Sequence, residues 1–571
     1  MSQNYVSLYR RTLASRQQIY NDSIASGKYQ PFLYPWDSLF ALVLLLAVTL
    51  TPRLPARLGV AVRWLAFTLI FAHSIHVILH RRTLWFAGGY GIGLCTAWGT
   101  IMSGALLVCN DIEHDFCRLE ARELLPQTSE VASNGSTIPC ASSKAKDPTS
   151  ASIDLKRRKV PGVYTATDIK QPTFANSQDA ATKPYRLVWQ AFPYDSSWLH
   201  VIDWTMDLVT SFRGVGWNHR IPTLAEIDAP IPPTPAMRQH KPRGQVDTER
   251  KPTAIPRQTL RAMQQRAVAD FIVSYLVLDF LKTTMVTDPY FMGLGGLESP
   301  SPWLWLSAMT KTIPIATKFV RLVMSMAGVV AALTFIFSLS PLFFTVVLPA
   351  AVDFTKVTRS PLLEPWLYPP QWYPLTTSVL QTGLAGFWGK FWHQMFRYGI
   401  SQPSQALIQR LGMDSRGNGA RIIQLLIAFG LSGSIHAAAS FTSFSVVGTH
   451  PLSGPLSFFL LQSLGVFIQT LATKFLHKAF SWMKSMPRVV GRTTNVLVTL
   501  TFLYFTGPLL ANDFARSGIW LFEPVPISLL RGFGFGPGGK DEGFWAWSQD
   551  GSTWVGWWQG KGWWETGLAI Y

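Results

Sequence analysis

The amino-acid sequence predicts an all-α, multi-pass transmembrane helical protein. Only 14% of its 571 residues are charged, whereas soluble globular domains carry about 25%. Hydrophobic residues make up 48% of the chain and stand in long blocks that contain very few charges. These blocks exceed the usual length of a β-strand, and a segment inside lipid must pair its backbone groups internally. Membrane-spanning helices satisfy both conditions.

The net charge of the chain and the position of its basic residues limit the kinds of partner that the protein is expected to bind. Lys and Arg number 50 against 32 Asp and Glu, which gives a net charge of +18. Such an excess is also typical of nucleic-acid binders, but here the basic residues lie in loops that flank apolar segments. We therefore expect membrane lipids and a polyanionic small ligand as partners, and no nucleic acid. The four cysteines form no CxxC pair, so neither a disulfide framework nor a metal site is expected.

The N-terminal part of the chain contains three apolar blocks. A polar segment, 1–35, precedes them. A bilayer core requires about 20 apolar residues per helix, and the blocks 36–51, 58–79 and 88–109 meet or approach this length. We expect each block to form one transmembrane helix within 36–109.

A polar insertion, 110–265, follows these helices. It is rich in Ser, Thr, Pro and Lys, a composition that predicts extensive disorder. The stretch 195–212 differs, because its apolar residues recur at helical spacing while three aspartates fall elsewhere. This stretch is either an amphipathic helix in the membrane interface or a surface helix of a small soluble subdomain.

A transmembrane core is expected over 266–511. Its apolar blocks are 267–281, 422–447, 456–475 and 496–510, together with a longer stretch, 321–352. Because Pro341 interrupts the longer stretch, it forms either one kinked span or two short ones. The chain would then have eight or nine spans in all. The remaining residues, 512–571, are a Gly- and Trp-rich tail, expected near the headgroups where tryptophan is favoured.

The segment 386–397, GFWGKFWHQMFR, is the first candidate for a functional site. If this segment forms a helix, one face is basic and carries a histidine, and the rest of the helix surface is mostly aromatic. That face would carry Lys390, His393, Gln394 and Arg397, against Phe387, Trp388, Phe391, Trp392 and Met395. Two interpretations fit this pattern. It is the rim of a cavity that receives a polyanion, or it is an anchor whose cations and tryptophans sit at the membrane interface.

The second candidate is His436, which lies deep in the predicted span 422–447. Ionisable side chains inside a membrane are costly and usually face the protein interior or a water-filled cavity. Small neighbours such as Gly433 and Ala437 would let another helix or a substrate come close. His436 is therefore either a reactive group or a neutral histidine that is hydrogen-bonded to a neighbouring helix.

These residues resemble the wax synthase branch of the membrane-bound O-acyltransferases, in particular fungal members that acetylate secondary metabolites. The resemblance rests on FWGKFWHQ at 387–394 followed by an intramembrane histidine. An Arg-Gly-x-Gly-Trp pattern at 213–217 and the DPYF sequence at 288–291 add to it. Two positions depart from the family pattern, which has a second basic residue in place of Phe391 and an acidic residue in place of Ala437.

The resemblance implies an O-acyltransferase that uses acyl-CoA, most simply acetyl-CoA, as co-substrate and holds no bound cofactor. The acceptor would be a lipophilic alcohol such as a terpenoid or polyketide. It also implies that His436 is catalytic and that His393 lies in or near the active site. An uncharged imidazole can accept the hydroxyl proton at neutral pH, so His436 is expected to act as general base without a covalent acyl-enzyme.

The other candidate residues divide by chemistry. Trp388, Trp392 and Gln394 are expected to contact the substrate. Lys390, Arg397 and Arg421 are expected to bind the phosphates of CoA, with Arg410 and Arg416 as further candidates.

Three alternatives remain open at this point. A long-chain wax ester synthase would share the residues above, whereas a multi-pass transporter or a non-enzymatic scaffold would belong to another class. A transporter should show paired broken helices or rows of ionisable residues through several spans. The expected location is an integral membrane position in the endoplasmic reticulum.

Overall fold

The computed structural model describes residues 2–84, 86–123, 185–224, 259–480, 487–547 and 554–571. Helices dominate this part of the chain, and its strands form only two small sheets. The predicted all-α class is confirmed.

Seven described helical segments are long and apolar enough to cross a membrane: Trp36–Arg53, Ala56–His80, Gly89–Leu107, Ala316–Ala351, Asn418–Thr442, Leu452–Ala479 and Arg488–Ser517. They contain helices α2 (Leu39–Leu50), α3 (Ala56–His80), α4 (Phe86–Leu107), α9 (Ala316–Leu342), α10 (Leu348–Ala351), α13 (Asn418–Thr442), α14 (Ser457–Ala479) and α15 (Arg488–Ser517). Large apolar side chains stay uncovered on these helices, as in α3, where Leu65 and Leu69 are 59% and 54% exposed. Lipid is the solvent that suits such a surface.

Two expectations about the spans change in the structure. The stretch containing Pro341 is one span, because α9 continues through a π-helical turn, Phe343–Val347, into α10. Helix α7 (Leu260–Met285), expected as a span over 267–281, is not among the seven, since its sequence includes charged residues such as Arg266 and Asp270. It packs lengthwise against α9.

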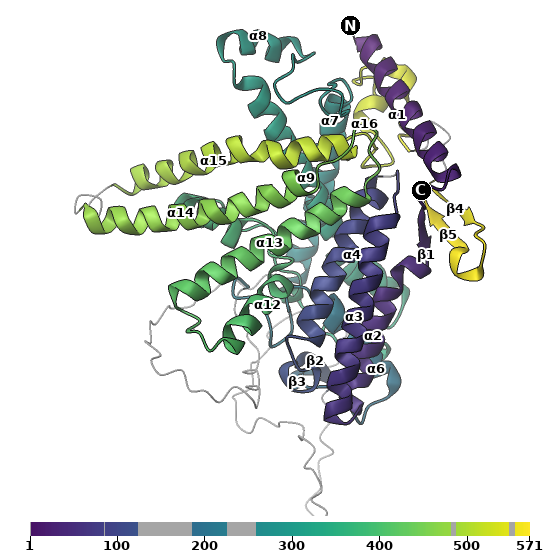
Figure 1. Ribbon diagram of the computed structural model, residues 1–571, viewed down its shortest axis with the longest axis vertical. Helices are drawn as coiled ribbons and strands as arrows, with labels where there is room; N and C mark the ends of the chain where they lie inside the picture. Colours follow the sequence, from purple (N-terminus) through teal and green to yellow (C-terminus); the bar gives the residue numbers. More distant parts are fainter. Residues whose placement is uncertain (1, 85, 124–184, 225–258, 481–486, 548–553) are drawn as a thin grey trace, which may run out of the picture.

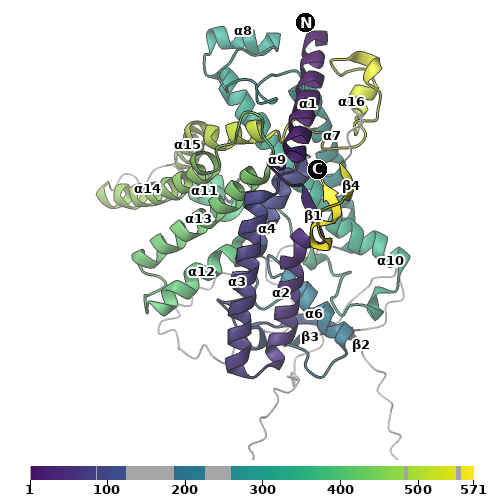
Figure 2. The same ribbon diagram turned by 45° about the vertical axis from the view of Figure 1, so that its right-hand side comes forward.

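The helices are arranged in two directions (Figures 1 and 2). Helices α2, α3 and α4 run side by side, whereas α13, α14 and α15 run across them. The largest apolar core lies where these groups meet, and it includes Trp98 and Met102 of α4, Tyr398 of α12 (Arg397–Arg410) and Ile435 of α13. The shorter helices are α5 (Ile112–Asp115), α8 (Leu304–Thr312), α11 (Val379–Gly386) and α16 (Leu529–Gly532).

The N-terminal and C-terminal segments of the chain pack together (Figure 1). Strand β1 (Phe32–Tyr34) pairs antiparallel with β5 (Gly567–Ile570), which pairs with β4 (Val555–Trp558). Arg16 of α1 (Ser2–Ala25) donates hydrogen bonds to two backbone carbonyls. One belongs to Phe444, just after α13, and the other to Ser517, the last residue of α15. The tail is therefore part of the fold, held by long-range pairing that the sequence pattern does not reveal.

Part of the polar insertion is also folded, while 124–184 and 225–258 lie outside the described residues. Strand β2 (Arg118–Glu123) pairs with β3 (Tyr185–Gln190), and α6 (Trp198–Thr210) forms within the predicted stretch. One face of α6 enters the core through Val201 and Trp204, and the other exposes Leu199 (77%). The predicted apolar face is only partly reproduced, because Trp198 and Ile202 fall on the exposed side while Asp203 and Asp207 pair with the buried Arg118.

The closest contact between the two groups of helices joins α4 to α13. Gly93 donates its backbone N–H to Thr442 Oγ1 (3.0 Å), and the same hydroxyl donates to the carbonyl of Gly89 (2.7 Å). A Cβ added to Gly93 would lie 2.2 Å from the carbonyl oxygen of Ala438. The two backbones can approach this closely only because glycines occupy the contact.

We expect Gly93→Ala to destabilise the fold by about 1–3 kcal/mol, because the added methyl group forces α4 away from α13. Gly91→Ala is the matched control on the same helix, since a Cβ there meets nothing within 4 Å. Thermal unfolding in detergent should show a lower midpoint for Gly93→Ala and an unchanged or higher one for Gly91→Ala. Equal midpoints would contradict the close contact.

Candidate active site

A cavity of about 910 Å³ lies among α12, α13, α14 and the segment that precedes α12. Further walls come from the loops that follow α4 and α6. The cavity is lined by most of the residues singled out in the sequence: Trp388, Trp392, His393, Gln394, Arg397, Arg421 and His436. Its size lies in the upper range of small-molecule sites. The structure thus brings together residues from two separate motifs.

His436 is held in this cavity by two neighbours. Its Nδ1 lies 2.9 Å from the hydroxyl oxygen of Tyr90, on α4. Its ring stacks on Phe459 of α14, with ring centres 4.8 Å apart and planes inclined by 11°. The structure therefore shows features of both interpretations of His436. One ring nitrogen is hydrogen-bonded to a neighbouring helix, as expected for a structural histidine, and the side chain lines a cavity, as expected for a reactive one.

The segment 386–397 is not one continuous helix, which corrects the predicted helical face. A π-helical turn, Phe387–Phe391, follows α11, and the backbone at Trp392 is extended (φ −62°, ψ 141°). Lys390 is consequently exposed and does not line the cavity with His393. Trp388 lies on the same turn and lines the cavity, packed edge-on against Phe429.

Gln394 and Arg397 close the turn that presents His393. The Gln394 side-chain amide donates to the carbonyls of Trp388 (3.1 Å) and Trp392 (2.5 Å). Arg397 donates to the carbonyl of Gly389 (2.8 Å) and to Gln394 Oε1 (2.7 Å). These bonds tie both side chains to the turn, so they shape the cavity wall in addition to lining it.

His393 is set among aromatic rings. Trp372 and Phe396 meet its ring edge-on, with centres 6.0 Å and 5.5 Å away. Burial, together with the nearby His436 and Arg213, lowers the pKa of His393 to about 3. The imidazole is therefore uncharged at neutral pH and is suited to hydrogen bonding of a polar substrate group.

The opposite end of the cavity is polar. Arg421, at the start of α13, is exposed, and its guanidinium makes no hydrogen bond or ion pair with any residue that the structure describes. Asn218, His219 and Arg220 line the same cavity from the loop after α6. The other two arginines proposed from the sequence, Arg410 and Arg416, are exposed and lie outside the cavity lining.

The Arg-Gly-x-Gly-Trp element explains how that loop reaches the cavity. Arg213 donates to the carbonyls of Pro369 and Pro370 (both 3.0 Å), and Trp217 is 1% exposed in the core. Gly214 and Gly216 have φ of +65° and +75°, values that only glycine adopts without strain. Tight turns at these glycines direct the residues after them towards the cavity.

The DPYF element has a different place. Asp288 and Arg321 form a fully buried ion pair at 2.9 Å, and Tyr290 and Phe291 are buried beside it. None of these residues lines the cavity. The element stabilises the packing around α9 and lies apart from the candidate site.

Three residues that line or support the site were missed in the sequence: Tyr90, His219 and Arg220. Tyr90 lies 346 positions from His436 and contacts it only because α4 packs on α13. The other two directly follow the Arg-Gly-x-Gly-Trp pattern, which was the signal that pointed to them.

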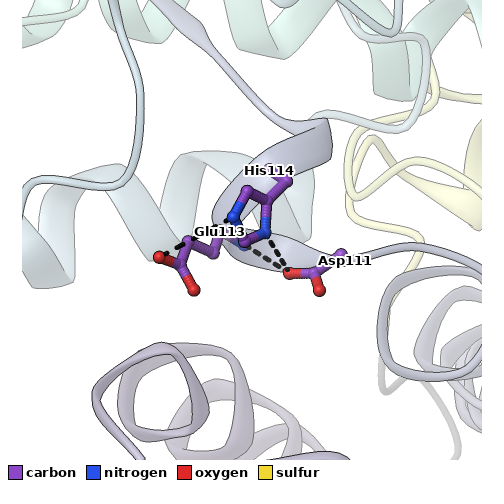
Figure 3. Close-up of side chains that lie close together, drawn as sticks. All are labelled: Asp111, Glu113 and His114. Carbon is purple, nitrogen blue, oxygen red and sulfur yellow. Dashed lines mark hydrogen bonds and ion pairs between the residues drawn. The ribbon is translucent and has the colours of Figure 1, made fainter. Parts of the chain in front are cut away.

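One group of potential metal ligands occurs among the described residues (Figure 3). His114 pairs with Asp111 (3.4 Å) and Glu113 (3.9 Å), and all three side chains are at least 40% exposed. Asp111 also pairs with Arg63. These mutual contacts account for the cluster, and we assign it no metal.

The cavity-lining segment matches a known family. A model of the membrane bound O-acyl transferase family matches residues 369–461, which include His393 and His436. The expected resemblance to the membrane-bound O-acyltransferases is confirmed. Among solved structures, none matches the chain.

Similar curated proteins are fungal acetyltransferases. The chain is 28% identical over 145 residues to acetyltransferase fsoF of Humicola fuscoatra, covering 24% of this chain and 34% of that protein. It is 29% identical over 167 residues to ataH of Aspergillus terreus, covering 28% and 52%. For aurG of Calcarisporium arbuscula the identity is 28% over 182 residues, covering 31% and 42%. The matches thus span between a third and about half of these relatives.

The buried state of His393 predicts a pH dependence of stability. Below the ordinary pKa of about 6.5 the unfolded chain binds a proton at this position, whereas the folded chain does not until pH falls towards 3. The fold should therefore lose stability as pH falls through this window. His393→Gln should reduce the loss, because glutamine does not titrate.

The measurement is the thermal midpoint in detergent at several values between about pH 7 and pH 4. His477→Gln, which changes an exposed histidine, is the control and should leave the profile unchanged. An identical acid-induced loss in wild type and His393→Gln would show that His393 is not held neutral.

Proposed function

We propose that this protein is a membrane-bound O-acyltransferase that transfers an acetyl group from acetyl-CoA to a hydroxyl of a lipophilic metabolite. The observation that carries the proposal is the meeting of His436 and His393 in one cavity whose walls come largely from the family-matched segment. The relatives named above support acetyl as the acyl group, because each is named an acetyltransferase. None of the three is named a wax ester synthase or a transporter.

His436 is the group we assign as general base. Its Nδ1 is occupied by Tyr90, which leaves Nε2 to take the proton from the acceptor hydroxyl. As that proton leaves, the alcohol oxygen bonds to the acetyl carbonyl carbon and the carbon–sulfur bond breaks. The imidazolium then returns the proton to the departing CoA thiolate, so the base is regenerated without a covalent acyl-enzyme.

His393 and the aromatic residues orient the acceptor. The uncharged His393 ring supplies a hydrogen-bonding group beside the apolar faces of Trp388 and Trp392. A lipophilic alcohol matches this chemistry, since its hydrocarbon part fits the aromatic wall and its hydroxyl meets an imidazole. We expect this acceptor to be a terpenoid or a polyketide.

The polar end receives the donor in this proposal. Fixed cations at one end of a cavity attract a multiply charged ligand; Arg421 lies at this end, at the start of α13, and Arg220 also lines the cavity. Arg397 contributes through the turn it closes. We place the protein in the endoplasmic reticulum membrane, where both a soluble donor and a lipid-dissolved acceptor can reach it.

The assay uses purified protein with radiolabelled acetyl-CoA or palmitoyl-CoA and a panel of lipophilic alcohols that contains a sesquiterpenol, a sterol and a phenolic polyketide. Extraction into organic solvent separates the ester from unreacted CoA thioester. The proposal predicts labelled product from acetyl-CoA. Product from palmitoyl-CoA alone would favour a long-chain wax ester synthase.

His436→Ala should lower the transfer rate by about 10²- to 10⁴-fold, because it removes the proton acceptor. Acetyl-CoA should still bind, since the arginines that line the cavity are unchanged. Direct binding of acetyl-CoA and turnover are measured on the same preparation, with Lys390→Ala as the active control. A variant that keeps more than about a tenth of the turnover would show that His436 is structural.

Arg421→Ala should weaken binding of acetyl-CoA and leave binding of the acceptor alcohol unaffected. Loss of one charge-assisted contact to a phosphate should raise the Michaelis constant for acetyl-CoA about tenfold. Lys390→Ala again serves as the matched control, because it removes an exposed cation close to the cavity that does not line it. Equal effects on the Michaelis constants of both substrates would argue against a donor site at this end.

A further inference from the structure

Tyr90 is the one described side chain that is hydrogen-bonded to the ring of His436. Its hydroxyl oxygen lies 2.9 Å from His436 Nδ1, and the tyrosine is only 8% exposed. The contact joins α4 to α13 across 346 positions of the chain. Tyr90 does not itself line the cavity.

The backbone around Tyr90 is fixed on both sides. Gly89 and Gly93 precede and follow it on α4, and both are hydrogen-bonded to the hydroxyl of Thr442 on α13. The Tyr90 ring meets Phe514 of α15 edge-on, with centres 5.4 Å apart. The hydroxyl therefore has little freedom to move away from His436.

We propose that Tyr90 is a positioning residue that selects the reactive tautomer of His436 and sets the direction of its ring. The inference rests on the proposed function, because a tautomer matters only if Nε2 exchanges protons with substrates. It adds a residue outside the family-matched segment, on a helix that contributes no side chain to the cavity.

The hydrogen-bonding chemistry gives the direction of the effect. A neutral imidazole carries one proton, and Nε2 can accept another only if that proton sits on Nδ1. Nδ1–H then donates to the Tyr90 oxygen. When Nε2 gains the proton of the alcohol, the ring becomes cationic and the bond to Tyr90 strengthens, since hydrogen bonds to charged groups are stronger.

The hydroxyl proton of Tyr90 then needs an acceptor of its own. Asp513, next to Phe514 on α15, is an electrostatic neighbour of Tyr90. Its Oδ1 accepts from Ser440 (3.1 Å) and from the backbone N–H of His450 (2.8 Å). Its buried Oδ2 has no hydrogen-bond partner among the described residues. A buried carboxylate oxygen without a partner among the described residues thus belongs to an electrostatic neighbour of Tyr90, and its negative charge favours a Tyr90 hydroxyl that accepts from His436.

The test is Tyr90→Phe, which removes one oxygen and keeps the ring. Turnover with radiolabelled acetyl-CoA and the alcohol of the panel that wild type acetylates fastest should fall about 10- to 100-fold. The Michaelis constants of both substrates should stay within about twofold of wild type, because Tyr90 contacts neither. Tyr20→Phe is the matched control: it removes the hydroxyl of another buried tyrosine, bonded to the carbonyl of Arg82 (3.0 Å) in a separate core, and should keep full activity.

A second measurement separates positioning from general stability. In the His436→Ala background, Tyr90→Phe should change the residual rate by less than about twofold, because the group it acts through is gone. A further large loss there, or full turnover of the single variant, would overturn the inference. If Tyr90→Phe is fully active while His436→Ala is inactive, only this inference fails. If wild type itself transfers no acetyl group, the proposed function fails with it.

Discussion

The contact between α4 and α13 is the constraint on which the candidate site depends. Glycines at 89 and 93 let the two backbones meet through the hydroxyl of Thr442. That approach brings Tyr90 to His436 and fixes one wall of the cavity. In a membrane, where burial of apolar surface does not drive helices together, close packing and interhelical hydrogen bonds are the main sources of such specificity. A bulkier residue at either glycine would separate the histidine from its only hydrogen-bonded neighbour in the described chain.

Charge is distributed in the cavity in a way that suits the proposed reaction. His393 is buried among aromatic rings and kept neutral, whereas the free guanidinium of Arg421 lies at the polar end. A soluble, multiply charged donor and an apolar acceptor would therefore be drawn to different ends, with the histidines between them. Proton transfer would take place where few charges compete for the proton.

Much of the fold follows from local sequence, because apolar blocks that are long enough to cross a bilayer are stable in lipid only as helices. The depth of His436 in its block also marks it as a candidate. The end of the helix at Phe391 was not foreseen, since local spacing allows a continuous helix there. In the structure Gln394 and Arg397 bond back to carbonyls of the preceding turn. Helix α7 is absent from the seven apolar segments because charges such as Arg266 and Lys282 lie on both sides of its apolar centre.

Contacts between distant segments account for the rest of what the sequence did not show. Strand β1 pairs with β5, which lies more than 500 residues away in the sequence. No periodic pattern in the sequence predicts that pairing. Tyr90 likewise looks like an ordinary interfacial aromatic until α13 is placed against it. The Arg-Gly-x-Gly-Trp element was recognised, but only the bonds of Arg213 to Pro369 and Pro370 explain why it matters for the cavity.

The central claim is that the acetyl group is transferred beside His436. A structure determined with a hydrolysis-resistant thioether analogue of acetyl-CoA and a lipophilic alcohol tests it most directly. The account predicts that the CoA phosphates lie near Arg421 and Arg220, and that the acceptor hydroxyl lies within about 3.2 Å of His436 Nε2. Binding of the analogue outside this cavity, or a hydroxyl out of reach of His436, would contradict the account.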